Sequence, residues 1–244
     1  MTKLFLIPKP NPHATLRLFC FPYAGGAPNI FMPWLNKLPN NVELVLIQLP
    51  GRGARLMEAP HNKMSSIIDE LMLHSSFITQ KPNVFFGHSL GSRVAYELAL
   101  TLQKNNLALP QKLIASGSRA PHLENHKTPI YHLPESEFIT KLRELNGTPK
   151  EVLDNAELME LFLPLLRADF EIADCYQTEK HPLPVPIDVF FGHEDIDVTP
   201  PMINAWQALS ALPITQHAFN GDHFFINSHS EQVIKAVSKL LNSL

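Results

Sequence analysis

The chain has 244 residues, of which 45% are hydrophobic and 18% are charged, so it can bury a substantial core within a single domain. Its formal net charge of −3 at pH 7 gives no electrostatic reason to expect a nucleic-acid partner. No apolar run approaches the roughly 20 residues of a membrane-spanning helix, and the short apolar start, closed by Pro8 and Pro10, does not read as a secretion signal.

Short apolar segments rich in β-forming residues alternate along the chain with longer segments of helical spacing. We predict strands at Leu4–Ile7, Leu16–Phe21, Glu43–Gln48, Asn83–His88, Lys112–Ser116, Ile187–Gly192 and Ile214–Phe219. We predict helices at Met64–Ile78, Ser89–Gln103, Pro201–Ala211 and Glu231–Leu241. This alternation predicts an α/β fold, with a mostly parallel central sheet and helices on both faces.

The alternation stops between about residues 122 and 186, where no strand is evident. Helical spacing there predicts helices at Glu135–Leu145, Glu151–Leu165 and Arg167–Gln177, with a kink or boundary at Pro164. We therefore expect one domain over residues 1–244, carrying a helical insertion between two core strands. Its apolar residues could line a channel or could simply pack the helices together; they are Phe138, Leu142, Met159, Phe162 and Leu166.

The sequence Gly87-His88-Ser89-Leu90-Gly91 has the G-x-S-x-G form of a nucleophile elbow. An apolar run leads into it as a strand would, and residues at helical spacing follow it. Glycines flank the serine because a Cβ at either position would clash in so sharp a turn. We interpret Ser89 as a catalytic nucleophile; the alternative is a serine that caps a helix in a glycine-rich turn.

A serine hydroxyl is a weak nucleophile at neutral pH and needs a histidine base that is oriented by a carboxylate. In α/β-hydrolases the acid and the base follow the serine in that order, each in a loop after a late strand. Asp195 and His223 occupy such positions. The competing candidates are Glu194 and Asp197 for the acid and His193, His217 and His229 for the base, while Asp222 is better suited to forming a turn.

The same chemistry needs backbone N–H groups that bind the oxyanion of the tetrahedral intermediate. One donor should be the N–H of Leu90, directly after the nucleophile. The other should come from the loop after an early strand, where paired glycines follow Tyr23 and Ala24. We predict the N–H of Ala24, or that of Tyr23, as the second donor.

Six segments spread over nearly the whole chain are similar to the type II thioesterases associated with non-ribosomal peptide and polyketide synthases. They are Phe19–Gly26 (FCFPYAGG), Gln48–Arg55 (QLPGRGAR), Gly87–Gly91 (GHSLG), Ser116–Pro121 (SGSRAP), Leu166–Phe170 (LRADF) and Gly221–Phe225 (GDHFF). The first two segments are more specific than the serine motif, which many hydrolases share. The chain departs from the family at Asp222, where a glycine is usual, and in the elbow at Leu90 and Ser92, where methionine and alanine are common.

The resemblance implies an α/β-hydrolase fold in which the insertion at about 122–186 is a mobile helical lid. It also implies a substrate, an acyl or aminoacyl thioester on the phosphopantetheine arm of a carrier protein, and an editing role in antibiotic or siderophore biosynthesis. The triad positions of the family fall on Ser89, Asp195 and His223. Four arginines in the shared segments could hold loops together or contact a phosphate: Arg52, Arg55, Arg119 and Arg167.

A serine triad alone does not distinguish sulfur from oxygen leaving groups, so a medium-chain acyl-CoA or acyl-carrier thioesterase and a small-molecule esterase remain alternatives, as does an inactive protein that docks on a synthase. We expect no metal ion and no organic cofactor, because acyl transfer through a serine requires neither. Two cysteines, Cys20 and Cys175, read as small core residues and fit a reducing compartment. We expect a cytoplasmic monomer without a membrane partner.

Overall fold

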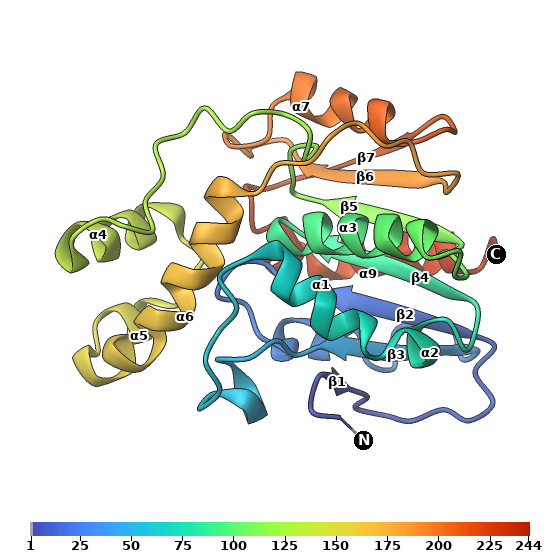
Figure 1. Ribbon diagram of the computed structural model, residues 1–244, viewed down its shortest axis with the longest axis horizontal. Helices are drawn as coiled ribbons and strands as arrows, with labels where there is room; N and C mark the ends of the chain where they lie inside the picture. Colours follow the sequence, from blue (N-terminus) through green and yellow to red (C-terminus); the bar gives the residue numbers. More distant parts are fainter. Residues whose placement is uncertain (1) are drawn as a thin grey trace.

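The computed structural model describes residues 2–244 and contains a seven-stranded sheet in the order β1-β3-β2-β4-β5-β6-β7 (Figure 1). Every neighbouring pair is parallel except β1 and β3, which are antiparallel. The strands are β1 (Phe5–Leu6), β2 (Leu16–Phe21), β3 (Val42–Ile47), β4 (Asn83–His88), β5 (Lys112–Ser116), β6 (Ile187–Gly192) and β7 (Thr215–Phe219). The predicted α/β class and mostly parallel sheet are confirmed.

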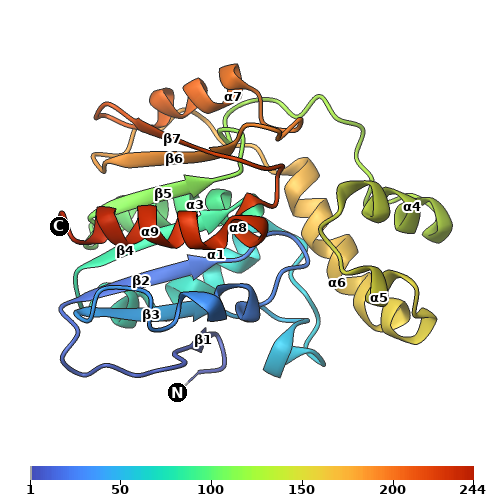
Figure 2. The ribbon, with the colours of Figure 1, turned by 180° about the vertical axis from the view of Figure 1, so that it is seen from behind.

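Helices cover both faces of the sheet, because its strands carry apolar side chains on both faces. α1 (Met64–Met72), α2 (Ser75–Ile78) and α3 (Leu90–Lys104) lie in front of the sheet in Figure 1. α8 (Phe225–Ser228) and α9 (Ser230–Leu241) lie in front of it in Figure 2, which shows the opposite side. Along β2, Phe19 and Phe21 join the core under α1 and α3, whereas Leu18 and Cys20 join the core under α9.

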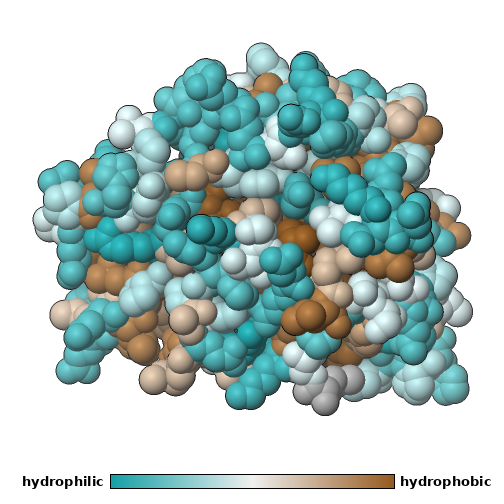
Figure 3. All heavy atoms as spheres, viewed as in Figure 1, coloured by the Kyte–Doolittle hydropathy of each residue, from teal (hydrophilic) through white to brown (hydrophobic). Residues whose placement is uncertain are grey.

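A block of three helices is inserted between β5 and β6: α4 (Glu135–Leu145), α5 (Lys150–Leu153) and α6 (Ala156–Cys175). It lies beyond the end of the sheet toward which the arrowheads of β2 and β6 point, so it stands over the carboxyl ends of the strands (Figure 1). The block has a small core of its own, formed by Phe138, Leu142, Leu153, Met159, Leu163 and Leu166. Figure 3 shows apolar surface over this block within a mostly hydrophilic face.

Several predicted helix boundaries were wrong. No helix boundary lies at Pro164, since α6 runs through the proline. The predicted helix Glu151–Leu165 is divided earlier, between α5 and α6, where the Asn155 side chain accepts the N–H of Leu158 as an N-cap. The predicted helix Met64–Ile78 is interrupted at His74, whose backbone is not helical and whose ring packs against Phe5. The segment after Thr199 forms α7 (Pro200–Asn204) and then a tighter 3-10 turn, Ala205–Leu209.

Some short elements were not predicted. Two further 3-10 segments, Pro28–Trp34 and Gly53–Arg55, follow β2 and β3. Neither segment has apolar residues that recur with a period of 3.6 over several turns, which is the pattern that reveals a helix in a sequence. Because β2, β3 and β4 are parallel, the loops that contain these segments start at the same edge of the sheet as the end of β4.

Candidate active site

Ser89 lies at the sharp turn between β4 and α3, in the position that the sequence predicts for a nucleophile. Its backbone has φ 54° and ψ −116°, a left-handed conformation that is rare for residues other than glycine. The Ser89 N–H donates to the carbonyl of Ser116 at 2.7 Å, which fixes the turn against β5. Strain of this kind persists only where the surroundings hold the backbone, and it is typical of functional sites.

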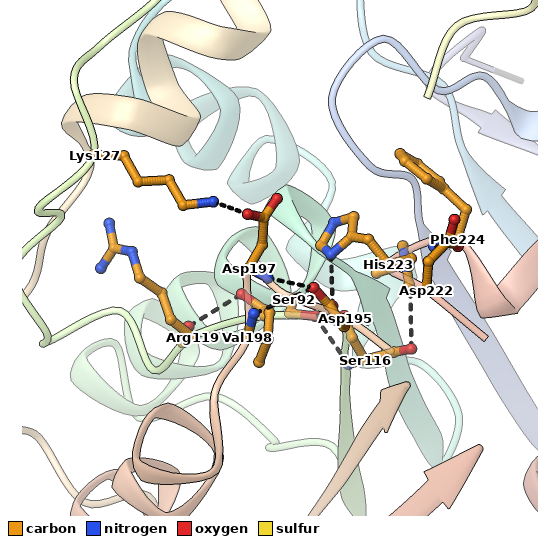
Figure 4. Close-up of polar contacts among 12 residues, drawn as sticks. Ser92, Ser116, Arg119, Lys127, Asp195, Asp197, Val198, Asp222, His223 and Phe224 are labelled. Atoms are coloured by element: carbon orange, nitrogen blue, oxygen red, sulfur yellow. Dashed lines mark hydrogen bonds and ion pairs between the residues drawn. The ribbon is translucent and has the colours of Figure 1, made fainter. Parts of the chain in front are cut away.

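Asp195 and His223 come from the loops after β6 and β7 and meet at the same edge of the sheet. His223 Nδ1 lies 2.8 Å from Asp195 Oδ2 (Figure 4). The other carboxylate oxygen accepts the backbone N–H groups of Asp197 and Val198 at 2.9 and 3.2 Å. Burial is the largest influence on Asp195 and opposes its ionisation, but the hydrogen bond and the charge of His223, together with the backbone N–H of Asp197, outweigh it, so the pKa of Asp195 is lowered. The ionised carboxylate holds the proton on Nδ1 and leaves Nε2 as the basic nitrogen.

Ser89 and His223 line one cavity of about 260 Å³ that lies between the sheet edge and the helical block. No hydrogen bond joins the two side chains in the described part of the chain, residues 2–244. Contacts between a nucleophile and its base are often long in the absence of substrate. The arrangement therefore brings the predicted nucleophile and a carboxylate-oriented base to the same cavity.

The competing residues have other partners or positions. Asp197 forms an ion pair with Lys127 (Figure 4), and Asp222 accepts the N–H of Phe224 in a local turn. His217 is held by Asp188 at 2.6 Å. Glu194, His193 and His229 are not among the residues that line the cavity.

The loop after β2 forms a tight turn in which the N–H of Gly26 donates to the carbonyl of Tyr23 at 2.8 Å. Gly25 has φ +74°, as the third residue of a type II turn requires. Both Tyr23 and Ala24 line the cavity beside Ser89. Leu90 is the first residue of α3, so its N–H has no acceptor within the helix and is available to a ligand. These are the backbone groups that the sequence predicts for an oxyanion hole.

The structure decides between the two roles that the sequence leaves open for the apolar residues of the insertion. Of the five residues named there, only Leu142 lines the cavity. Phe138, Met159 and Leu166 are buried in the core of the helical block instead. The other apolar side chains in the wall of the cavity are Ala24, Ile130, Leu145, Phe170, Ala173, Val198, Met202 and Phe224.

Known proteins are similar to this chain over nearly its whole length. The family model described as "Thioesterase domain" matches residues 16–241. The chain belongs to the thioesterase family. It is 39% identical to "Linear gramicidin dehydrogenase LgrE" of Brevibacillus parabrevis, over 99% of this chain and 94% of that protein. It is 36% identical to "Gramicidin S biosynthesis protein GrsT" of Aneurinibacillus migulanus, over the same shares of the two chains.

Among solved structures, the thioesterase resembles YbtT, the type II thioesterase of the yersiniabactin NRPS/PKS pathway. The TM-score is 0.85 at 29% identity, and the match covers 97% of both chains. The predicted resemblance to type II thioesterases and the predicted enzyme class are thereby confirmed. The name of LgrE describes that protein; in the present chain the segment after β3, Gly51-Arg52-Gly53, lacks the third glycine of a dinucleotide fingerprint.

The arginines of the family segments hold loops of the thioesterase together. Arg52 pairs with Asp169, and Arg55 pairs with Glu58 and Glu70. Arg119 donates to the backbone carbonyl of Leu123, and Arg167 donates to that of Tyr131.

Cys20 is buried as predicted, but Cys175 is exposed near the end of α6, so its assignment to the core was wrong. Within residues 2–244 no helix combines the length and the apolarity needed to cross a membrane.

The role of His88 was not predicted from the sequence, where this residue appeared only as part of the serine motif and as the end of a strand. The ring is fully buried, with Nε2 2.9 Å from the carbonyl of His223 and Nδ1 2.9 Å from Ser116 Oγ. A carbonyl can only accept, so Nε2 carries the proton and Nδ1 accepts from the serine hydroxyl. His88 therefore holds the backbone of the candidate base. The available signal was its place at the end of a buried strand, where both ring nitrogens need partners.

We expect His88 to make the protein less stable in acid. Burial, and next the positive charge of His223, lower the pKa of His88 to about 3, whereas an unfolded chain has a histidine pKa of about 6.5. Between these values the unfolded chain binds a proton that the folded chain does not, so the free energy of unfolding should fall as the pH falls, by about 1.4 kcal/mol per pH unit for this group.

Urea denaturation between pH 7 and pH 4 tests this expectation. His88→Gln should have a flatter stability profile than the wild type across this window, whatever its stability at pH 7. His13→Gln, at an exposed position, serves as the control and should follow the wild type. Parallel profiles for all three proteins would show that His88 does not stay neutral in the folded state.

Proposed function

We propose that this thioesterase hydrolyses acyl or aminoacyl thioesters carried on the phosphopantetheine arm of a carrier protein, and so edits a non-ribosomal peptide or polyketide synthase. The observation that carries the proposal is that Ser89, the His223 that Asp195 orients, and the loop of Tyr23 and Ala24 all line one cavity. The family membership and the similarity to GrsT and YbtT support the choice of substrate.

In the proposed mechanism, His223 Nε2 removes the proton of Ser89 as the hydroxyl oxygen attacks the thioester carbonyl. The carbonyl oxygen becomes an oxyanion, which the N–H of Leu90 and that of Ala24 or Tyr23 stabilise. When the tetrahedral intermediate collapses, the carbon–sulfur bond breaks and the imidazolium returns its proton to the departing thiolate. Water, deprotonated by the same histidine, then hydrolyses the acyl-serine.

We assign a lid function to the insertion at about 122–186. The helical block closes the cavity over Ser89, and Leu142, Leu145 and Phe170 supply apolar wall that suits an acyl chain. Its connection to the core includes the ion pair between Lys127 and Asp197, close to the loop of the triad acid. Opening of the block would admit the phosphopantetheine arm, and closure would hold the acyl chain against the apolar wall during the reaction.

We further propose that the enzyme acts as a monomer in the cytoplasm. The cysteines, Cys20 and Cys175, are both free thiols, in agreement with a reducing compartment. Hydrolysis of acyl-CoA or of small oxygen esters is the alternative function, because the same residues could attack either carbonyl.

The choice between these substrates can be tested by comparing kcat/KM on three substrates that share one acyl group: an acyl carrier protein, the acyl-CoA and an oxygen ester. We expect the carrier-bound thioester to be hydrolysed most efficiently. Ser89→Ala should lose activity on all three by a factor on the order of 10⁴ to 10⁶ while remaining folded. Equal kcat/KM values on the three substrates would contradict the carrier-protein assignment, and a folded, active Ser89→Ala would contradict the covalent mechanism.

The assignment of the triad acid has a matched control within the same loop. Asp195→Asn should lower kcat by a factor on the order of 10⁴, because the amide no longer holds the histidine in the tautomer that leaves Nε2 basic. Asp197→Asn removes a carboxylate two residues away that forms an ion pair with Lys127 rather than with His223, so kcat should change by less than about tenfold. Comparable losses in the two variants would mean that the acid is misassigned.

A further inference from the structure

A buried carboxylate joins the helical block to the loop that carries the candidate oxyanion donors. Asp169 lies on α6, and its side chain is only 1% exposed. It accepts two hydrogen bonds from Arg52, from Nη2 at 2.8 Å and from Nη1 at 3.0 Å. It also accepts the backbone N–H of Gly25 at 2.7 Å. Three N–H groups thus donate to one carboxylate, so the buried ion pair of Asp169 and Arg52 has a further hydrogen bond from the backbone.

Arg52 contacts the same turn on its other side. While Nη1 and Nη2 hold Asp169, Nη1 also donates to the carbonyl of Gly26 at 3.0 Å. The pair therefore binds the N–H of Gly25 on one side of the turn and the carbonyl of Gly26 on the other. Helix α6 also packs closely against the turn, since a Cβ on Gly25 would lie 2.6 Å from Leu166 Cδ2.

These contacts fix the direction of the Ala24 N–H, because each peptide unit is planar. The unit between Tyr23 and Ala24 contains both the Ala24 N–H and the Tyr23 carbonyl, and that carbonyl accepts the N–H of Gly26. The next unit contains the N–H of Gly25, which Asp169 holds. Both peptide units that flank Ala24 are thereby immobilised.

We propose that Asp169, together with Arg52, is a positioning residue for the oxyanion hole: the buried pair holds the Tyr23–Gly26 turn so that a backbone N–H faces the carbonyl that Ser89 attacks. This inference rests on the proposed function, since it assumes acyl transfer at Ser89.

The contact of Asp169 with this turn also divides α6 into two parts. The part after Pro164 is fixed to the oxyanion loop, so opening of the lid involves α4, α5 and the residues of α6 that precede the proline, where one helical hydrogen bond is missing.

Asp169→Asn tests the proposal, with Glu43→Gln as its matched control. Glu43 forms a similarly buried pair with Arg17, at 2.8 Å and 7% exposure of both side chains, near the starts of β2 and β3 and hence at the opposite edge of the sheet. Both variants lose one buried carboxylate and should lose stability. Asp169→Asn should in addition lower kcat by about 10- to 100-fold with little change in KM, because only the transition state needs the oriented N–H. Glu43→Gln should keep the kcat of the wild type.

Inhibitor binding separates this role from a structural one. A boronic acid forms a tetrahedral adduct with a catalytic serine, so its Kd for Asp169→Asn should rise by the factor by which kcat falls, whereas the Kd of the product carboxylic acid should not change. If Asp169→Asn is too unstable to study, the double variant Arg52→Met/Asp169→Leu leaves no unpaired charge and should show the same loss of kcat.

Unchanged kcat in a folded variant, or equal weakening of both inhibitors, would overturn the positioning role. Assays with an activated ester alongside the carrier-bound thioester keep the two proposals apart. A wild-type enzyme that fails only on the thioester refutes the proposed substrate, while an unimpaired Asp169→Asn on either substrate refutes the role of Asp169.

Discussion

Backbone contact between the start of α3 and the end of β2 is the constraint on which the rest of the site depends. Gly91 packs so closely that a Cβ there would lie 2.1 Å from the carbonyl oxygen of Phe21 and 2.7 Å from that of Pro22. Gly87 is packed equally closely within the elbow, where a Cβ would lie 2.2 Å from the carbonyl oxygen of Gly91. Two missing side chains thus let the strained Ser89 turn lie directly against the loop of Tyr23 and Ala24.

Other loops reach this contact because the strands are parallel and their carboxyl ends share one edge of the sheet. A different buried hydrogen bond fixes each of them there. Asp195 orients the ring of His223, His88 holds the backbone carbonyl of the same residue, and Asp169 holds the turn after β2. The site is therefore set by interactions between loops, while the strands supply the positions from which those loops start.

The sequence was sufficient to predict the sheet, the elbow and the positions of Asp195 and His223, because local patterns encode them: an apolar run, a glycine-flanked serine, and a polar residue directly after a strand. It could not predict the partners of Arg52 and His88. Asp169 lies 117 residues from Arg52, and His223 lies 135 residues from His88, so no local spacing connects either pair. Side chains of this kind are recognisable as buried only once the fold has brought their partners together.

The helical block shows the same limit. Apolar spacing correctly indicated that Phe138 and Met159 are buried, but spacing does not say against what, and both residues pack within the block. Pro164 was expected to kink or end a helix. α6 continues through it, since burial of Leu163 and Leu165 on either side outweighs the loss of one backbone hydrogen bond. Tertiary packing decided what local propensity left open.

The central claim is that the start of α3 and the Tyr23–Gly26 turn after β2 together form the oxyanion hole. A crystal structure of the enzyme inactivated by an acyl phosphonate would test this claim most directly. We expect phosphorus bonded to Ser89 Oγ, with one phosphonate oxygen within about 3 Å of the N–H groups of Leu90 and of Ala24 or Tyr23, and with the hydrogen bond from Gly25 to Asp169 intact. An adduct on another residue would contradict the account, as would a phosphonate oxygen that faces away from both N–H groups.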